Sequence, residues 1–253
     1  MDLGLSGKRA VVTGATRGIG RAIAQRLAEE GCDVAVCART RTHLATTVAE
    51  LQATGRRAFG QRVDVADGAA LCAFVEAAAA VFGGLDVFVS NASGALGGEN
   101  DEGSWRRGVE IDVLGTMRGC EAALPYLEAS GSGAIVVVST AAVSEVIGSR
   151  RAYNSVKAAI HPYIKGLARD VAPNNVRANI VSPGTILHDG SVWDERRLHR
   201  PGEYAQAVAS NPMGRLGTAD EVADAVVFLA SPRASFISGA NLVCDGARTR
   251  TVF

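Results

Sequence analysis

The chain has 253 residues, 47% of them hydrophobic and 5% aromatic, and its 26 basic residues balance its 26 acidic ones. This length suits one large α/β domain, and a net charge of zero gives no support for binding to a nucleic acid. The five cysteines and four histidines lack the spacing of a disulfide framework or a metal site. No apolar run reaches the ~18 residues of a membrane span, and the N-terminus lacks a signal sequence. We therefore expect a cytoplasmic protein with neither metal nor membrane contact.

Short apolar segments alternate with amphipathic ones along the chain, which predicts strands and helices in turn. The predicted strands are apolar on both faces, as buried parallel strands are. Their alternation with helices predicts a single-domain, Rossmann-type α/β fold: a doubly wound parallel sheet of seven strands with helices on both faces. The strands are expected at Arg9–Thr13, Asp33–Ala38, Ala58–Val63, Val87–Ser90, Ala134–Ser139, Ala178–Val181 and Leu242–Asp245, and the helices at Gly18–Glu29, Arg41–Ala53, Gly68–Phe82, Ser104–Leu127, Tyr153–Val171 and Ala219–Leu229.

One segment, Ile186–Pro212, interrupts this alternation. It is polar, lacks a clear period and contains Trp193 and Tyr204. A long insertion after the carboxyl end of a strand is typical of a lid or a binding loop. We interpret residues 186–212 as a substrate lid within the one domain, with an ordered surface excursion as the alternative.

The first turn of the chain is rich in glycine. Residues 13–20 read Thr-Gly-Ala-Thr-Arg-Gly-Ile-Gly and lie between the first predicted strand and the first predicted helix. Glycines let the backbone approach a diphosphate closely, and the helix N-terminus offers free N–H groups to it. In this position the motif predicts a dinucleotide site. The residues expected to contact the cofactor are Gly14, Thr16, Arg17, Gly18, Ile19 and Gly20.

The end of the second predicted strand bears on which dinucleotide binds. Many NAD-binding proteins place an acidic residue there for the ribose 2′-hydroxyl, whereas this strand ends in Arg39. A guanidinium cannot accept a hydrogen bond from that hydroxyl but suits a 2′-phosphate, and Arg17 is expected in the same region. NADP(H) is therefore favoured over NAD(H), unless both arginines are only solvated surface residues.

Tyr153 and Lys157 lie four residues apart in a predicted helix, so they share one face. An ammonium group one turn from a phenol favours the ionised phenolate and makes the tyrosine a proton donor and acceptor near neutral pH. The pair alone is a weak signal, because surface helices produce it by chance. Its occurrence after the glycine turn makes the combination specific.

Together these features resemble the short-chain dehydrogenase/reductase family over nearly the whole chain, and most of all its 3-oxoacyl-carrier-protein reductase-like group. Asp64-Val65 is similar to the family's adenine-binding pair, and Ser90-Asn91-Ala92-Ser93 is similar to its Asn-Asn-Ala-Gly motif. The resemblance implies cofactor contacts from Asp64, Val65, Asn91, Ala92, Tyr153, Lys157 and the turn Pro183-Gly184-Thr185-Ile186.

Two positions depart from the catalytic residues of that family. Its serine lies 13 residues before the tyrosine, and counting back from Tyr153 reaches Thr140. Thr140 keeps the hydroxyl, whereas Ser139, the alternative, should point to the opposite side of the strand. Asp112 stands where the family has an asparagine that holds a water beside the lysine. An ionised Asp112 near Lys157 would oppose the effect of the lysine on Tyr153 and move the activity optimum to higher pH.

The sequence therefore predicts an NADP(H)-dependent oxidoreductase that interconverts a ketone and a secondary alcohol, with Tyr153 as the acid and base. One alternative is an NAD-dependent alcohol dehydrogenase of the same family. Another is a dinucleotide-binding sensor or assembly subunit without turnover. The resemblance also implies a homotetramer, or else a dimer, built from the helices at Ser104–Leu127 and Tyr153–Val171 and the last strand. We expect the substrate pocket to be lined by Ser93–Gly98, Ala141–Ile147 and the lid.

Overall fold

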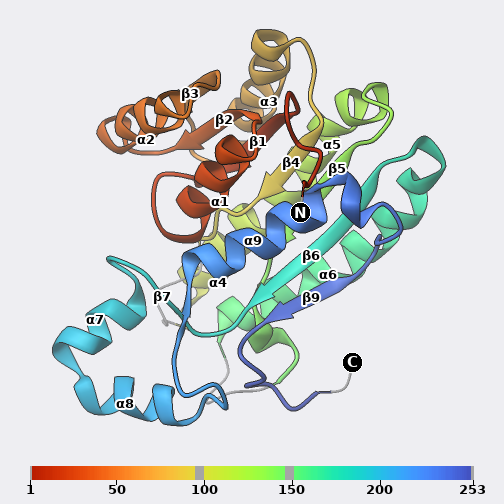
Figure 1. The fold of residues 1–253 in the computed structure, drawn as a ribbon. Coiled ribbons are helices and arrows are strands. Elements are labelled where there is room, and N and C mark those ends of the chain that lie inside the picture. Colours follow the sequence, from red (N-terminus) through yellow and green to blue (C-terminus); the bar gives the residue numbers. More distant parts are fainter. Residues whose placement is uncertain (1, 95–99, 146–150, 252–253) are drawn as a thin grey trace.

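The computed structural model describes residues 2–94, 100–145 and 151–251. Seven parallel strands form one sheet in the order β3-β2-β1-β4-β5-β6-β9 (Figure 1). The strand order reverses between β1 and β4, which is the switch point where doubly wound sheets bind ligands. The strands are β1 (Arg9–Thr13), β2 (Asp33–Ala38), β3 (Ala58–Arg62), β4 (Val87–Ser90), β5 (Ala134–Val138), β6 (Arg177–Pro183) and β9 (Asn241–Cys244).

Helices cover both faces of the sheet, as the alternating sequence pattern predicts (Figure 1). One face packs against α1 (Gly18–Glu29), α2 (Arg41–Ala53) and α9 (Ala219–Ala230). The other packs against α3 (Gly68–Phe82), α5 (Gly115–Ala129) and α6 (Ala152–Val171). Successive strand side chains point to opposite faces, so Val12 and Val36 join the first core while Val11 and Ala35 join the second. The prediction of a seven-stranded, doubly wound α/β fold is confirmed.

The predicted helix at Ser104–Leu127 is divided in the structure. It comprises α4 (Glu102–Gly108), a π-helical segment η1 (Val109–Leu114) and α5. A π-helical turn inserts an extra residue into the helix and is common at functional sites. Asp112 lies in this segment and is completely buried.

The segment Ile186–Pro212, which showed no clear period in the sequence, is largely helical. It contains β7 (Ile186–Leu187), α7 (Val192–His199) and α8 (Pro201–Ala209), and β7 pairs with β8 (Gly217–Thr218). The two helices lie beyond the carboxyl ends of the strands, apart from the helices that cover the sheet (Figure 1). They are short, and α7 buries no residue, so the sequence offered no amphipathic stripe to find.

Three 3₁₀ turns complete the described chain: η2 (Ala141–Val143), η3 (Ala172–Asn174) and η4 (Pro232–Ala234). Among the described helices, none combines the length and apolar character needed to cross a bilayer.

Because all seven strands of the main sheet are parallel, the residues that follow their carboxyl ends lie along a single edge. That edge carries the predicted site residues.

Candidate active site

Helix α6 carries Tyr153, Lys157 and His161 at intervals of four residues, which places them along one face. Tyr153 is half-buried, whereas the Lys157 side chain is 4% exposed. The Lys157 ammonium donates a hydrogen bond to the Val138 carbonyl oxygen at 2.9 Å, at the end of β5. The lysine is thus fixed between its own helix and the carboxyl edge of the sheet.

Asp112 is the charged partner of Lys157. Its Oδ1 lies 3.0 Å from the lysine Nζ, and its Oδ2 accepts a hydrogen bond from the Gly94 N–H at 2.9 Å. The contact with the lysine is an ion pair without hydrogen-bond geometry, and Oδ1 has no hydrogen-bond partner in the described part of the chain. Removal of either member of a buried ion pair leaves an uncompensated charge, so the burial of each side chain depends on the other. Asp112 thus lies beside Lys157, which is the arrangement that the sequence analysis considered for an ionised Asp112.

Ser139 and Thr140 follow β5 and have different partners. The Ser139 hydroxyl lies 2.9 Å from Nε2 of His161. Burial, and then the positive charge of Lys157, lower the pKa of His161, which favours the neutral imidazole. The Thr140 hydroxyl oxygen accepts a hydrogen bond from the Ala142 N–H at 3.3 Å, which leaves its own proton to donate. The Thr140 hydroxyl proton is therefore available to a ligand, whereas the Ser139 hydroxyl is already paired with His161.

The glycine turn between β1 and α1 has the shape of a phosphate cradle. Gly14 and Gly18 have φ values of 65° and 52°, in the left-handed region that favours glycine. A Cβ at Gly20 would collide with the Asn91 amide and the Gly14 carbonyl oxygen. Asn91 Nδ2 donates to the carbonyl oxygens of Thr13 and Gly14 at 3.0 and 3.1 Å, so this side chain braces the turn. The turn can bring its backbone N–H groups close to a diphosphate.

Other residues expected around the cofactor lie along the same edge. Thr16 and Ile19 are half-buried, and Ile19 packs against the core beside α1. Asp64 is exposed and accepts a hydrogen bond from the Ala66 N–H, while Val65 is buried. Ala92 follows Asn91 and donates from its N–H to the Thr13 hydroxyl. Of these residues, Ala92 bonds the start of the glycine turn directly, as Asn91 does.

Arginines gather beside the turn, at the ends of β2 and β3. Arg17 and Arg39 are exposed, and neither forms an ion pair with any residue that the structure describes. The sequence analysis missed Arg62, whose Nε donates to the Arg39 carbonyl oxygen at 2.9 Å. The register that places Arg62 beside Ala38 was the signal that could have identified it. Three guanidinium groups in this region suit an anion such as a phosphate.

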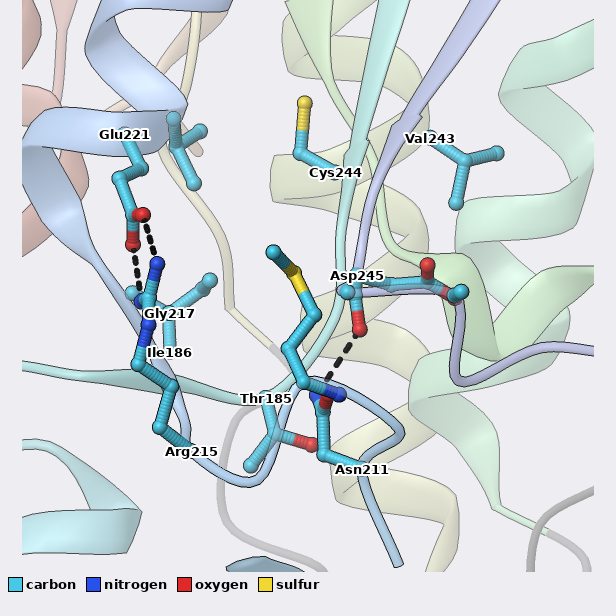
Figure 2. Close-up of a pocket in the computed structure, with 13 residues that line it drawn as sticks. Thr185, Ile186, Asn211, Arg215, Gly217, Glu221, Val243, Cys244 and Asp245 are labelled. Atoms are coloured by element: carbon cyan, nitrogen blue, oxygen red, sulfur yellow. Dashed lines mark hydrogen bonds and ion pairs between the residues drawn. The ribbon is translucent and has the colours of Figure 1, made fainter.

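The turn Pro183-Gly184-Thr185-Ile186 borders a cavity of about 220 Å³ (Figure 2). The Gly184 N–H donates to the Cys244 carbonyl oxygen, and a Cβ at Gly184 would collide with Asp245. Thr185 and Ile186 line the cavity together with Asn211 from the end of the lid. Tyr153 and Lys157 are not among the residues that line this cavity.

Comparison with known proteins identifies the family. Residues 14–248 match the protein family described as Enoyl-(Acyl carrier protein) reductase. The chain is 36% identical over 252 residues to isoepoxydon dehydrogenase of Penicillium expansum, covering 97% of this chain and 96% of that protein. The chain belongs to the short-chain dehydrogenase/reductase family.

Other members of the short-chain dehydrogenase/reductase family are similar in sequence and in fold. Cis-4-hydroxycyclohexanecarboxylate dehydrogenase of Sinomonas cyclohexanicum is 40% identical over 247 residues, covering 95% of this chain and 96% of that protein. The crystal structure of L-sorbose reductase from Gluconobacter frateurii, complexed with NADPH and L-sorbose, superposes with a TM-score of 0.90 at 32% identity and covers all of both chains. Similar solved structures include complexes with NADP(H) and with NADH.

The predicted substrate pocket of this short-chain dehydrogenase/reductase is only partly within the described residues. Ser93 and Ala141 are described, whereas 95–98 and 146–147 of the predicted lining lie outside them. The Ser93 hydroxyl is buried and has no hydrogen-bond partner among the described residues. An orphaned buried hydroxyl next to Asn91 and Ala92 fits a bound polar group, since such groups are rarely left unpaired.

Proposed function

We propose that this chain is an NADP(H)-dependent oxidoreductase that interconverts a ketone and a secondary alcohol, with Tyr153 as the catalytic acid and base. The observation that carries the proposal is the fixed position of Lys157 one helical turn from Tyr153. A half-buried phenol beside a buried ammonium group can release and recover a proton at a carbonyl oxygen.

The neighbouring residues have complementary roles in this proposal. Tyr153 donates its proton to the substrate oxygen during reduction and accepts it during oxidation. Thr140 donates a hydrogen bond to the same oxygen and so fixes its position. Lys157 has three N–H donors, of which one binds Val138 and another faces Asp112, leaving one for the ribose of the cofactor. Asp112 is a positioning residue that holds the lysine and, through its free Oδ1 lone pair, a relay water.

The residues along the carboxyl edge fit a dinucleotide. The glycine turn accommodates a diphosphate, the Ser93 hydroxyl lacks a partner among the described residues, and Arg17, Arg39 and Arg62 suit a 2′-phosphate. When bound, the nicotinamide supplies or takes up the hydride. The residues proposed to hold the cofactor are Gly14, Thr16, Arg17, Gly18, Ile19, Gly20, Arg39, Asp64, Val65, Asn91, Ala92, Tyr153, Lys157, Pro183, Gly184 and Ile186.

A ring-bearing alcohol is the substrate that we propose to test first. The name of the relative with 40% identity refers to a hydroxyl on a cyclohexane ring. The site here supplies one proton donor and one hydroxyl for the reacting oxygen, which is what a secondary alcohol on a ring requires. The chemistry of the remaining substrate groups is set by other residues.

Tyr153→Phe tests the catalytic proposal. The variant keeps the ring but loses the proton, so we expect turnover of cyclohexanol and cyclohexanone to fall by at least ~100-fold, in the range of general acid–base catalysis. Tyr163→Phe is the matched control, because Tyr163 lies on the same helix and its hydroxyl bonds Glu121 at the surface. Initial rates and NADPH titrations should be measured on both variants. Tight NADPH binding without turnover in the wild type would favour the sensor or assembly subunit.

The exposed apolar residues support a proposal of self-association into a homotetramer. Trp105 and Val109 are 40% and 41% exposed on α4 and η1, and Leu242 and Val243 are 37% and 38% exposed on β9. Strand β9 is an edge of the sheet, where unpaired backbone groups and apolar side chains favour association. Sedimentation velocity should give the mass of four chains, and a monomer at micromolar concentration would contradict the proposal.

A further inference from the structure

We propose that Arg248 binds an anionic group of the substrate, a carboxylate above all, at the site of Tyr153. This inference rests on the proposed function and specifies its substrate class: secondary alcohols and ketones that carry a carboxylate at the far end of a ring. The observations come from the C-terminal tail that follows β9.

The tail is anchored to two other segments. Asn211, at the end of the lid, donates from Nδ2 to the Asp245 carbonyl oxygen at 3.0 Å (Figure 2). The Thr249 N–H donates to Oδ2 of Asp245 at 2.8 Å, which closes the tail into a turn. Ala247, inside that turn, has a φ of 63°, a conformation that disfavours residues with a Cβ. The backbone therefore holds an unfavourable conformation immediately before Arg248.

This turn directs Arg248 onto the end of the neighbouring strand β6. The guanidinium donates to the Thr185 hydroxyl, and the side chain is half-buried. It forms no ion pair with a carboxylate of the described chain. Arg215, which lines the nearby cavity, is by contrast bound by both oxygens of Glu221 at 2.5 and 2.8 Å (Figure 2). A half-buried guanidinium with most of its five donors unused is suited to a carboxylate from outside the chain.

The topology places this cation near the proposed reaction centre. Strand β9 pairs with β6, and β6 pairs with β5, which leads into Thr140. Neighbouring strands lie about 4.8 Å apart, so the ends of β5 and β9 are separated by roughly 10 Å. The Arg248 guanidinium bonds Thr185, which follows β6, so it lies closer to β5 than the end of β9 does. A substrate with its hydroxyl at Thr140 and Tyr153 and a carboxylate across a six-membered ring would span the gap.

The cofactor is a second source of the same anionic chemistry. Thr185 belongs to the turn expected to hold the nicotinamide, so the guanidinium could face a cofactor phosphate instead. The two sources can be distinguished by neutralising Arg248. If Arg248 binds the substrate, NADPH affinity stays unchanged, whereas if it binds a cofactor phosphate, NADPH affinity falls. The experiment therefore includes both ligands.

Binding of cyclohexanecarboxylate to the protein saturated with NADP⁺ is the primary test. This probe lacks the hydroxyl and cannot react, so titration calorimetry measures its affinity whether or not the enzyme turns over. We expect Arg248→Met to weaken its binding at least tenfold. Arg250→Met, which removes the same charge two residues along the exposed tail, should bind like the wild type. Equal affinity for wild type and Arg248→Met, or no binding to the wild type, would overturn the proposal.

Steady-state kinetics provide the second test. Arg248→Met should lower kcat/KM for 4-hydroxycyclohexanecarboxylate at least tenfold while changing that for cyclohexanol less than threefold. An equal loss with both substrates, or weaker NADPH binding in the variant, would overturn the assignment to the substrate. If the wild type turns over neither alcohol, the proposed function fails, and the calorimetric test still decides whether Arg248 binds the anion.

Discussion

The buried carboxylates at the amino end of the sheet form ion pairs, whereas three arginines at its carboxyl end do not pair with any described residue. At the amino end, buried Asp86 is held by Arg9 and Lys8 at 2.6 and 3.2 Å, and buried Asp33 is held by Arg57 and Arg56 at 2.7 and 3.1 Å. At the carboxyl end, Arg17, Arg39 and Arg248 form no ion pair within the described chain. The paired charges stabilise the fold, and the unpaired arginines are the ones for which ligand binding is proposed above.

Two ion pairs at the carboxyl end depart from this pattern: Arg215 and Glu221 at the surface, and Lys157 and Asp112, which are almost fully buried. The pair of Lys157 and Asp112 resembles the buried ion pairs of the amino end, but it lies at the proposed active site. The proposals above therefore give this pair a role in stability as well as in catalysis, and give Arg17, Arg39 and Arg248 a role in ligand binding alone. The role of the pair in stability and the role of the arginines in binding can be tested separately.

Lys157→Met should produce the largest change in stability. It leaves Asp112 charged and buried without its partner, which costs about 3–5 kcal/mol in the free energy of unfolding. The double variant Asp112→Leu/Lys157→Met removes both charges and should recover most of that loss, although not the activity. Urea denaturation of the two variants measures this difference, and a double variant as unstable as the single one would refute the ion-pair explanation.

Asp86→Asn should produce the next largest change. It removes a carboxylate that accepts from the Arg9 side chain and N–H and from Lys8, so we expect a loss of about 2–3 kcal/mol in unfolding free energy. NADPH affinity should stay unchanged, because this end of the sheet is remote from the proposed site. Urea denaturation and a NADPH titration give the two numbers, and a large loss of affinity would break the contrast between the two ends.

The same carboxylate predicts a dependence of stability on pH. Burial raises the pKa of Asp86, but the hydrogen bonds from Arg9 and Lys8 outweigh it and hold the pKa below its ordinary value. A depressed pKa means that the stabilisation is present above the unfolded pKa, near 3.9, and is lost as pH falls through the lower folded value. The stability gap between wild type and Asp86→Asn should narrow below pH 4.

Arg39→Ala should change ligand binding without changing stability. Loss of a charge-assisted contact with the 2′-phosphate should weaken NADPH binding about tenfold, or about 1.4 kcal/mol, and the difference should shrink as salt screens the exposed charge. NADH, which lacks that phosphate, is the matched control and should bind wild type and variant alike. Fluorescence titrations at two salt concentrations test this, and tighter binding of NADH to the wild type would instead favour the NAD-dependent alternative.

The fold was predictable because its signals are local. Apolar strands such as Val87–Ser90 and amphipathic helices such as α1 each show their period within a few residues. The π-helical segment at Asp112 and the two lid helices were not, because an inserted residue and short polar helices leave no such period. The tyrosine and lysine were identified from their spacing, whereas the positions of Arg62 and Arg248 depend on strand register and on a C-terminal turn that the sequence pattern does not reveal.

Asp112→Asn should produce the smallest change in turnover, because asparagine keeps the shape of the side chain and its amide oxygen can still accept the Gly94 N–H bond. The variant also leaves the Lys157 ammonium buried without its countercharge, so we expect it to lose unfolding free energy for the same reason as Lys157→Met. Initial rates of alcohol oxidation should stay within a few fold of the wild-type rate. Glu121→Gln is the matched control, since it removes one carboxylate from the neighbouring helix at a surface position. If Asp112→Asn abolishes turnover while the protein remains folded, the charge of Asp112, and not only its position, is needed for catalysis.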